Sequence, residues 1–227
     1  MLMDYYELTM SNGYFEKGFK DKMVVFDMFY RKNPDNGGFV VSAGLEQLIE
    51  YIENMHFSKE DIEFLRSKGE FSEGFLQYLA DFKFTGNIDA LPEGTICYPN
   101  TPIVTVTAPV IEAQLIETML LLTMNFQSLI ATKASRICRT AAESGAVVME
   151  FGARRAHGGD AAILGARAAY IGGAAATATV MADERFGVPA IGTMAHSWIQ
   201  FFDNEYEAFK AYAEVYPDNC TLLIDTY

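Results

Sequence analysis

Apolar and polar positions follow two different rhythms along the chain. In the first half, helix-length amphipathic segments and short β-branched runs occur without a fixed order, which indicates a mixed α+β domain. The predicted helices span residues 5–17, 45–55, 59–67 and 73–82, and the predicted strand spans residues 23–30. Ser58, three residues before Asp61, approximates a capping box at the start of the third helix.

Residues 86–109 change to alternating β-branched positions with prolines at 92, 99, 102 and 109. This pattern predicts a small antiparallel sheet whose prolines occupy edges and turns rather than a central strand. Residues 111–142 then predict one long helix. Apolar residues nearly encircle it, so we expect it to be buried on several sides.

Beyond residue 144, strands alternate with helices of about ten residues, which predicts βα units around a parallel sheet or barrel. The predicted strands are 146–150, 189–192 and 221–225, and the predicted helices are 161–170, 180–186 and 205–215. We therefore expect an α+β domain over 1–110, a helical connection to about 143, and the first part of an irregular α/β barrel over 144–227. Only three or four barrel strands are accounted for, so we expect the chain to be a fragment of a longer protein.

Composition narrows the kinds of partner. The formal net charge of −13 over 227 residues would repel nucleic acid, although a local basic cluster can still bind a small anion. The three cysteines lack any CxxC pairing, which argues against zinc and a disulfide framework and favours a cytoplasmic location. The first ten residues lack a signal-peptide pattern, and the most apolar helix, 115–126, is too short to span a membrane.

Two segments place cationic side chains beside glycines: EFGARRAHG at 150–158 and GTMAHSW at 192–198. Glycine lets the backbone approach an anion, arginine holds a carboxylate or phosphate through two parallel bonds, and histidine changes charge near neutral pH. Both segments follow predicted strands, where barrel enzymes carry catalytic groups. For Arg154 and Arg155, the alternative is a surface ion pair with Glu150 or Asp160.

His196 follows a predicted strand and is suited to proton transfer, anion contact or nucleophilic attack on phosphorus, with a structural role as the alternative. Asp225 ends another predicted strand and is suited to Mg²⁺ or sugar hydroxyls, with a helix cap as the alternative. Arg136 and Arg139 lie on one face of the long helix, which suits phosphate or simply a solvated surface.

Six separated segments resemble the nicotinate phosphoribosyltransferases of bacteria. They are DYYELTM at 4–10, FQSLIATKASRI at 126–137, EFGARRAHG, YIGGAAATATV at 170–180, FGVPAIGTMAHSW at 186–198 and LLIDTY at 222–227. The resemblance runs through essentially the whole chain and implies a type II phosphoribosyltransferase-like fold. It also implies synthesis of nicotinate mononucleotide from nicotinate and phosphoribosyl diphosphate, with ATP hydrolysis and Mg²⁺, by a cytoplasmic homodimer with shared active sites.

The resemblance assigns roles to particular residues. It implies that Tyr6 and Phe151 stack on opposite faces of the pyridine ring, with Tyr6 reaching a neighbouring subunit's site. Arg154 would hold the nicotinate carboxylate, while Gly192 and Ser197 would border the substrate. As catalytic residues, His196 would be phosphorylated by ATP and Asp225 would bind ribose or Mg²⁺.

This sequence departs from the family where many members have Phe-Asp-Gly-Thr-Ser-Asn after paired glycines. Residues 174–179 are Ala-Ala-Ala-Thr-Ala-Thr, so any role of that aspartate cannot be transferred. The family's later barrel strands are also absent, so we expect the chain alone to be inactive. Two alternatives stay open: a relative acting on nicotinamide or quinolinate, and a non-catalytic protein that retains the fold.

Overall fold

The computed structural model describes all residues, 1–227, and its first half is built on a three-stranded antiparallel sheet. The strands are β1 (Met23–Met28), β5 (Val104–Pro109) and β3 (Asn87–Ala90), in the order β1-β5-β3. In the central strand, Val106 pairs with Phe26 on one side and Ile88 on the other. The predicted antiparallel sheet is confirmed, but Pro109 belongs to the central strand, where no proline was expected. Its prolines fit because Pro102 precedes β5 and Pro109 is its last residue.

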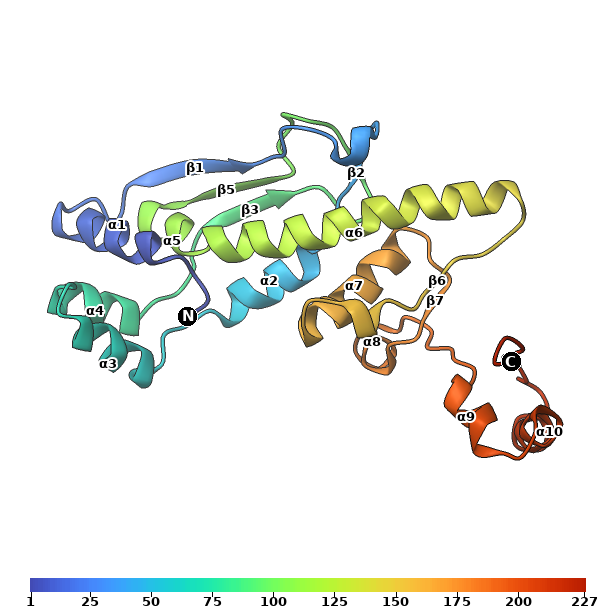
Figure 1. Ribbon diagram of the computed structural model, residues 1–227. Coiled ribbons are helices and arrows are strands. Elements are labelled where there is room, and N and C mark those ends of the chain that lie inside the picture. The colour runs from blue at the N-terminus through green and yellow to red at the C-terminus, as the bar shows by residue number, and fades with distance from the viewer.

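Helices pack against the sheet and around its end (Figure 1). They are α1 (Tyr5–Glu16), α2 (Leu45–Asn54), α3 (Lys59–Lys68) and α4 (Glu73–Ala80), accompanied by the 3-10 turn η1 (Pro34–Asn36) and the short antiparallel pair β2 (Val40–Val41) and β4 (Ile96–Cys97). One core joins α1, α3, α4 and α5 (Val110–Leu115), and a second joins the sheet to α2 and α6 (Glu117–Glu143). The predicted capping box of α3 is confirmed, because Ser58 and Asp61 exchange both hydrogen bonds.

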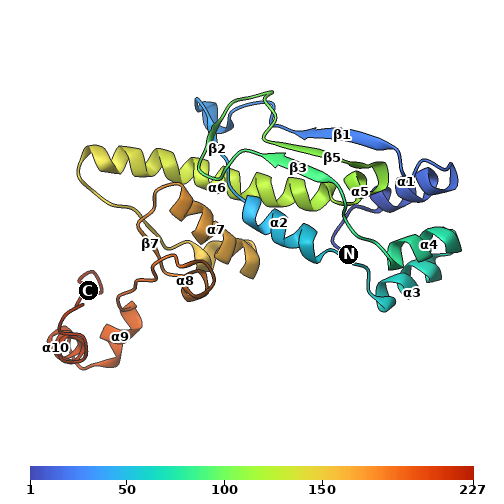
Figure 2. The same ribbon diagram turned by 180° about the vertical axis from the view of Figure 1, so that it is seen from behind.

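The long predicted helix is in fact two helices, α5 (Val110–Leu115) and α6 (Glu117–Glu143). The chain leaves the helical path at Ile116, and the break gives α6 an amino terminus of its own. The buried Glu7 caps that terminus by accepting a 2.9 Å hydrogen bond from the Thr118 N–H. Helix α6 runs along the molecule and connects its two halves in both views (Figures 1 and 2).

The second half begins a parallel α/β arrangement. Its elements are β6 (Met149–Glu150), η2 (Ala153–Arg155), α7 (Gly159–Ile171), β7 (Ala176–Thr177) and α8 (Val180–Phe186). Strand β7 lies between the predicted helices 161–170 and 180–186, where no strand was predicted. The predicted strand 189–192 is reduced to a single parallel bridge between Thr177 and Ala190. The fold class is confirmed: an α+β domain followed by the start of an α/β barrel.

Residues beyond 192 lie apart from the rest in both views (Figures 1 and 2). They form α9 (His196–Phe201) and α10 (Glu205–Val215), so His196 begins a short helix rather than lying on a loop. The predicted strand 221–225 was wrong, because this segment is irregular and pairs with no neighbouring strand. Asp225 is therefore not at a strand end. No helix of the chain combines the length and the apolar character needed to cross a bilayer.

Candidate functional site

Three parallel segments end at one edge of the second half. The Ala175 N–H donates to the Val148 carbonyl and the Ala178 N–H to the Glu150 carbonyl, which joins β6 to β7. On the other side of β7, the Thr177 N–H donates to the Pro189 carbonyl, and the Ile191 N–H donates to the Thr177 carbonyl. Residues that follow Glu150, Thr177 and Ile191 therefore emerge at the same carboxyl edge, where ligands of α/β proteins bind.

Glu150 organises this edge. Its Oε2 accepts a 2.7 Å hydrogen bond from the hydroxyl of Thr177, which is fully buried, and its Oε1 accepts from the Gly152 N–H. The Thr179 N–H donates to Thr177 Oγ1 at 3.0 Å, while the Thr179 hydroxyl is buried and has no partner. The edge therefore has a fixed polar floor and one buried hydroxyl without a partner.

The arginines of η2 carry the cationic charge of this edge. The ion pairs of the chain have Arg66, Arg136, Arg167 and Lys210 as cations. The alternative of a surface ion pair between Arg154 or Arg155 and Glu150 or Asp160 is therefore wrong, because the Glu150 carboxylate is held by Thr177 and Gly152 instead. Phe151, beside these arginines, is 43% exposed. A loop that carries an unpaired guanidinium and an exposed aromatic ring suits an aromatic carboxylate.

A cavity of about 270 Å³ lies next to this loop, between η2, α6 and α7. Arg155 and His157 line it together with Glu150, and Phe126 and Ile130 of α6 supply apolar lining. Arg154 and Phe151 do not line it. The two adjacent arginines therefore differ in surroundings, as their neighbouring positions in a tight turn allow.

His196 lies in the separate carboxyl-terminal part. Its Nδ1 is 3.2 Å from Thr226 Oγ1, and the hydroxyl of Thr193 donates to the Thr221 carbonyl. These two contacts hold residues 221–227 against the segment before α9. Ser197 and Asp225 are exposed. No hydrogen bond or ion pair joins this group to residues 150–158, the arginine loop.

Gly192 and Tyr6 complete the predicted set. A side chain at Gly192 would meet nothing within 4 Å, so close packing does not explain the glycine. Tyr6 is 42% exposed on α1, at the opposite end of the molecule from β6 (Figure 1). Partial burial and, to a smaller extent, a hydrogen bond to Glu117 raise the pKa of Tyr6 to about 12, so its hydroxyl stays protonated and the side chain is neutral. Within one chain, Tyr6 does not meet Phe151.

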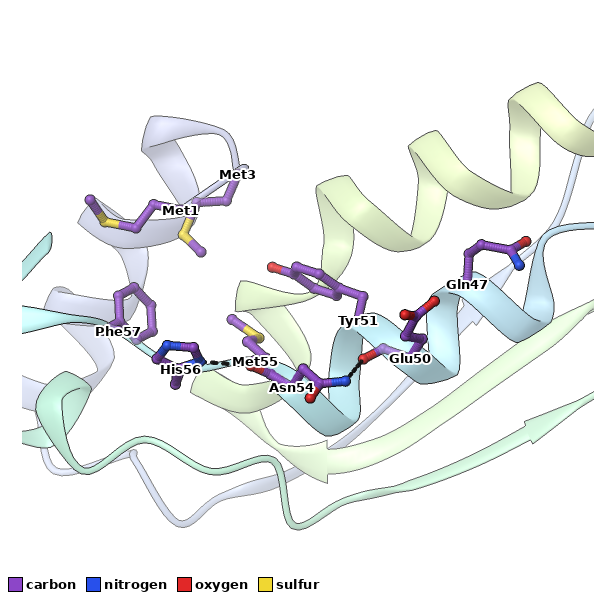
Figure 3. Close-up of a pocket in the computed structure, with 9 residues that line it drawn as sticks. All are labelled: Met1, Met3, Gln47, Glu50, Tyr51, Asn54, Met55, His56 and Phe57. Carbon is purple, nitrogen blue, oxygen red and sulfur yellow. Dashed lines mark hydrogen bonds between the residues drawn. The ribbon is translucent and has the colours of Figure 1, made fainter. Parts of the chain in front are cut away.

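A larger hollow of about 390 Å³ lies between the first residues of the chain and the end of α2 (Figure 3). Methionine, aromatic and uncharged or acidic polar side chains line it, and His56 Nδ1–H donates to the Asn54 carbonyl, 2.8 Å away. Neither lysine nor arginine lines it. It does not suit a phosphorylated or carboxylated ligand.

Two features of the second half were not predicted from the sequence. One is the bond between Glu150 and Thr177, which joins residues 27 positions apart on short strands that carry little signal. The other is Arg167, a buried arginine in the alanine-rich helix α7. A single arginine among small apolar residues was a sign of a buried ion pair. Arg136 proves structural, because it donates to the Pro34 carbonyl and pairs with Asp35.

The α+β layer, the long connecting helix and the parallel βα units define a type II phosphoribosyltransferase-like architecture. The crystal structure of human nicotinic acid phosphoribosyltransferase superposes with a TM-score of 0.82 and 33% identity, covering 89% of this chain and 41% of that one. The nicotinate-nucleotide pyrophosphorylase of Pyrococcus furiosus gives a TM-score of 0.76 and 27% identity over 94% of this chain and 46% of that one.

Sequence comparison narrows the class to one family. Residues 1–125 match the nicotinate phosphoribosyltransferase (NAPRTase) N-terminal domain. A nicotinate phosphoribosyltransferase of Mycobacterium tuberculosis is 45% identical over all 227 residues, which cover 48% of that relative, and the enzyme of Bacillus subtilis is 46% identical over 224 residues, with 45% covered. The chain belongs to the nicotinate phosphoribosyltransferase family. It spans about half the length of these relatives.

Proposed function

We propose that this chain is the amino-terminal part of a nicotinate phosphoribosyltransferase that makes nicotinate mononucleotide and diphosphate from nicotinate and phosphoribosyl diphosphate, coupled to ATP hydrolysis, in NAD salvage. The observation that supports this most is that one loop at the carboxyl edge carries Arg154, which forms no ion pair, and the exposed ring of Phe151. Residues 1–227 alone would not turn over, because the remaining barrel strands would complete the pocket.

The reaction forms one bond and breaks one. The pyridine nitrogen attacks the anomeric carbon, the bond from that carbon to the diphosphate oxygen breaks, and diphosphate leaves with the electron pair. We expect an oxocarbenium-like transition state that is stabilised by positioning and by neutralisation of the leaving group. In this proposal Arg154 and Phe151 orient the pyridine acid, while Gly192 and Ser197 border the substrate.

His196 would accept the γ-phosphoryl group of ATP and release it to water, yielding ADP and phosphate. The Thr226 hydroxyl beside Nδ1 would orient the imidazole for this step. A phosphorylated imidazole adds negative charge, so the phosphorylated and free forms would favour different occupancies of the neighbouring site. ATP hydrolysis would thereby tighten binding of phosphoribosyl diphosphate.

Mg²⁺ would reach this site mainly through its substrate. No group of three or more His, Cys, Asp or Glu side chains could hold a metal ion. The exposed carboxylate of Asp225 would be a suitable single ligand for Mg²⁺ that arrives with the diphosphate. The ion would neutralise the leaving diphosphate.

A homodimer would explain the position of Tyr6. Because α1 and β6 lie at opposite ends of one chain, Tyr6 would stack on the pyridine ring in the partner's site. The three free thiols suit the reducing cytoplasm in which we place the protein.

The proposal is tested by Arg154→Met in the complete protein. We expect the KM for nicotinate to rise about 10- to 100-fold, because a charge-assisted bidentate contact is lost, with a smaller change for nicotinamide. Arg66→Met, which removes an exposed arginine from α3, is the matched control. An unchanged KM for nicotinate in Arg154→Met would refute the assignment.

A second assay addresses coupling and the alternatives. The complete protein should hydrolyse ATP faster when nicotinate and phosphoribosyl diphosphate are both present, and His196→Ala should abolish that stimulation. Preference for nicotinamide or quinolinate over nicotinate would favour a related transferase. Binding without product formation would favour a non-catalytic member of the fold.

A further inference from the structure

The most buried cation of the chain lies away from the arginine loop. Arg167 of α7 is 8% exposed, and its guanidinium grips the Glu93 carboxylate with two bonds, Nη1 to Oε1 at 2.9 Å and Nη2 to Oε2 at 2.6 Å. Glu46 of α2 pairs with the same Nη2, and the Gln127 side-chain carbonyl of α6 lies 3.4 Å from Nη1. One side chain of the barrel part thus contacts two segments of the first half and the connecting helix α6.

Glu93 also serves the first half of the chain. Its Oε1 accepts from the N–H groups of Gly44 and Leu45, which begin α2. Burial alone would raise the pKa of Glu93, but hydrogen bonds from Arg167 and from these amides lower it below its ordinary value. The carboxylate is therefore charged at neutral pH and is shared between a helix cap and an ion pair.

The interface between α6 and α7 is formed by small side chains. The contacts between buried apolar side chains of α6 and α7 come from alanines, namely Ala131 and Ala134 of α6 and Ala168 and Ala169 of α7. Gly172 lies so close that an added Cβ would be 2.4 Å from the Ala131 carbonyl oxygen. Small side chains allow close approach but interlock weakly, so they fix the separation of two helices better than their relative orientation.

We infer that Glu93 and Arg167 are positioning residues, which set the orientation of α7 and thereby the place of the arginine loop relative to the first half of the chain. The inference rests on the proposed function in that this loop is taken to hold the substrate. A planar guanidinium bound at two oxygens fixes direction as well as distance. Neither residue touches the substrate.

The geometry of α7 connects the two places. Helix α7 begins at Gly159, directly after the loop, and η2 packs on it. Gly159 precedes Arg167 by eight residues, roughly 12 Å along the axis, so a tilt of about 10° would move it by about 2 Å. Misplacement by about 1 Å can reduce a rate about 100-fold.

Hydrogen exchange of the complete protein tests this inference. In Arg167→Met, we expect exchange at least about tenfold faster in α7 and in residues 150–158, with protection of α3 and α4 unchanged. Glu93→Gln keeps an acceptor for the Gly44 and Leu45 amides and should show the same localised effect more weakly, even if Arg167→Met folds poorly. The Arg66 guanidinium also binds two carboxylates, but on the surface. Arg66→Met should therefore leave exchange in α7 and in residues 150–158 unchanged.

Kinetics separate positioning from general stabilisation. Both variants should raise the KM for nicotinate about tenfold or more, with a smaller change in kcat, and Arg167→Lys should fall between them and the wild type. Uniformly faster exchange, or unchanged exchange in residues 150–158, would overturn the inference. If the wild-type protein does not convert nicotinate, the proposed function fails, while the exchange pattern still decides the role of Glu93 and Arg167.

Discussion

Two buried glutamates show how the same side chain takes opposite electrostatic roles. Glu7 is fully buried, and its Oε1 accepts from the N–H and hydroxyl of Thr118, while Oε2 has no partner. Burial raises the pKa of Glu7 more than the Thr118 hydrogen bonds lower it. Glu93 is also buried in part, but its pKa is lowered because a guanidinium faces it. The difference lies in whether a cation accompanies the carboxylate.

The raised pKa of Glu7 predicts how the stability of the fold depends on pH. Because its folded pKa lies above the ordinary 4.5, folded protein binds the proton more tightly, and this stabilisation is present below pH 4.5 and is lost as pH rises through the folded pKa. Glu7→Gln keeps an acceptor for Thr118 and removes the charge. Urea unfolding from pH 4 to 8 should therefore show the variant gaining stability relative to wild type as pH rises. Parallel stability curves over this range would contradict the raised pKa.

Gly44 illustrates a residue whose conformation and packing are both restrictive. Its φ is 109°, and an added Cβ would be 2.6 Å from the Thr123 carbonyl oxygen. Gly44→Ala should lower the free energy of unfolding by about 3 kcal/mol, since strain and backbone displacement combine. Gly18→Ala is the control, with φ 73° and open space around the glycine, and should cost about 1 kcal/mol. Equal losses in urea unfolding would show that crowding at Gly44 is negligible.

At the scale of the elements, the sequence pattern predicted the helices whose bounds depend on residues close together in the chain. Helices α8 and α10 were predicted to the residue, and α1 to α4 to within two residues at either end. The break at Ile116 was missed because its cap, Glu7, is distant in sequence. Strand β7 was not predicted because two residues among alanines show no alternation of apolar and polar positions. A strand at 221–225 was wrongly predicted because an apolar run forms a strand only where a neighbouring strand offers backbone hydrogen bonds. At the site, cation-bearing loops were visible, but the partners of Glu150 and Arg167 depended on tertiary contacts.

The capping box of α3 offers a matched test at this scale. The Ser58 hydroxyl accepts from the Asp61 N–H at 3.1 Å, and the Ser58 N–H donates to Asp61 at 2.8 Å. Ser58→Ala should cost about 1 kcal/mol, because the Asp61 amide loses its acceptor. Ser67→Ala removes a hydroxyl near the other end of the same helix that only bonds back to the Phe64 carbonyl, and should be nearly neutral. Equal losses in the free energy of unfolding for Ser58→Ala and Ser67→Ala would show that the capping box does not stabilise α3.

At the scale of the whole molecule, residues 193–227 form a small unit built around Trp198. The indole N–H donates to the Ala208 carbonyl at 3.1 Å, and the ring packs edge-on against Tyr212 with centroids 5.9 Å apart. Helix α10 packs mainly on α9, and both lie apart from the rest of the fold in two opposite views. The large cores of the chain contain residues from the first half and from α6. A unit with so few buried contacts to the rest should open at low free energy.

This arrangement predicts unfolding in two steps that one fluorophore can separate. Trp198 is the sole tryptophan, so its fluorescence reports residues 193–227, whereas far-UV circular dichroism is dominated by the helices of the first half. In urea, the fluorescence midpoint should lie below the circular dichroism midpoint, because the Trp198 unit loses its packing before the α6 cores do. A chain that ends at Gly192 should retain the circular dichroism midpoint of the longer one. Coincident transitions, or a lower midpoint for the shortened chain, would mean that residues 193–227 unfold together with the core. The Trp198 unit would then have to be closely coupled to the carboxyl edge that bears Arg154.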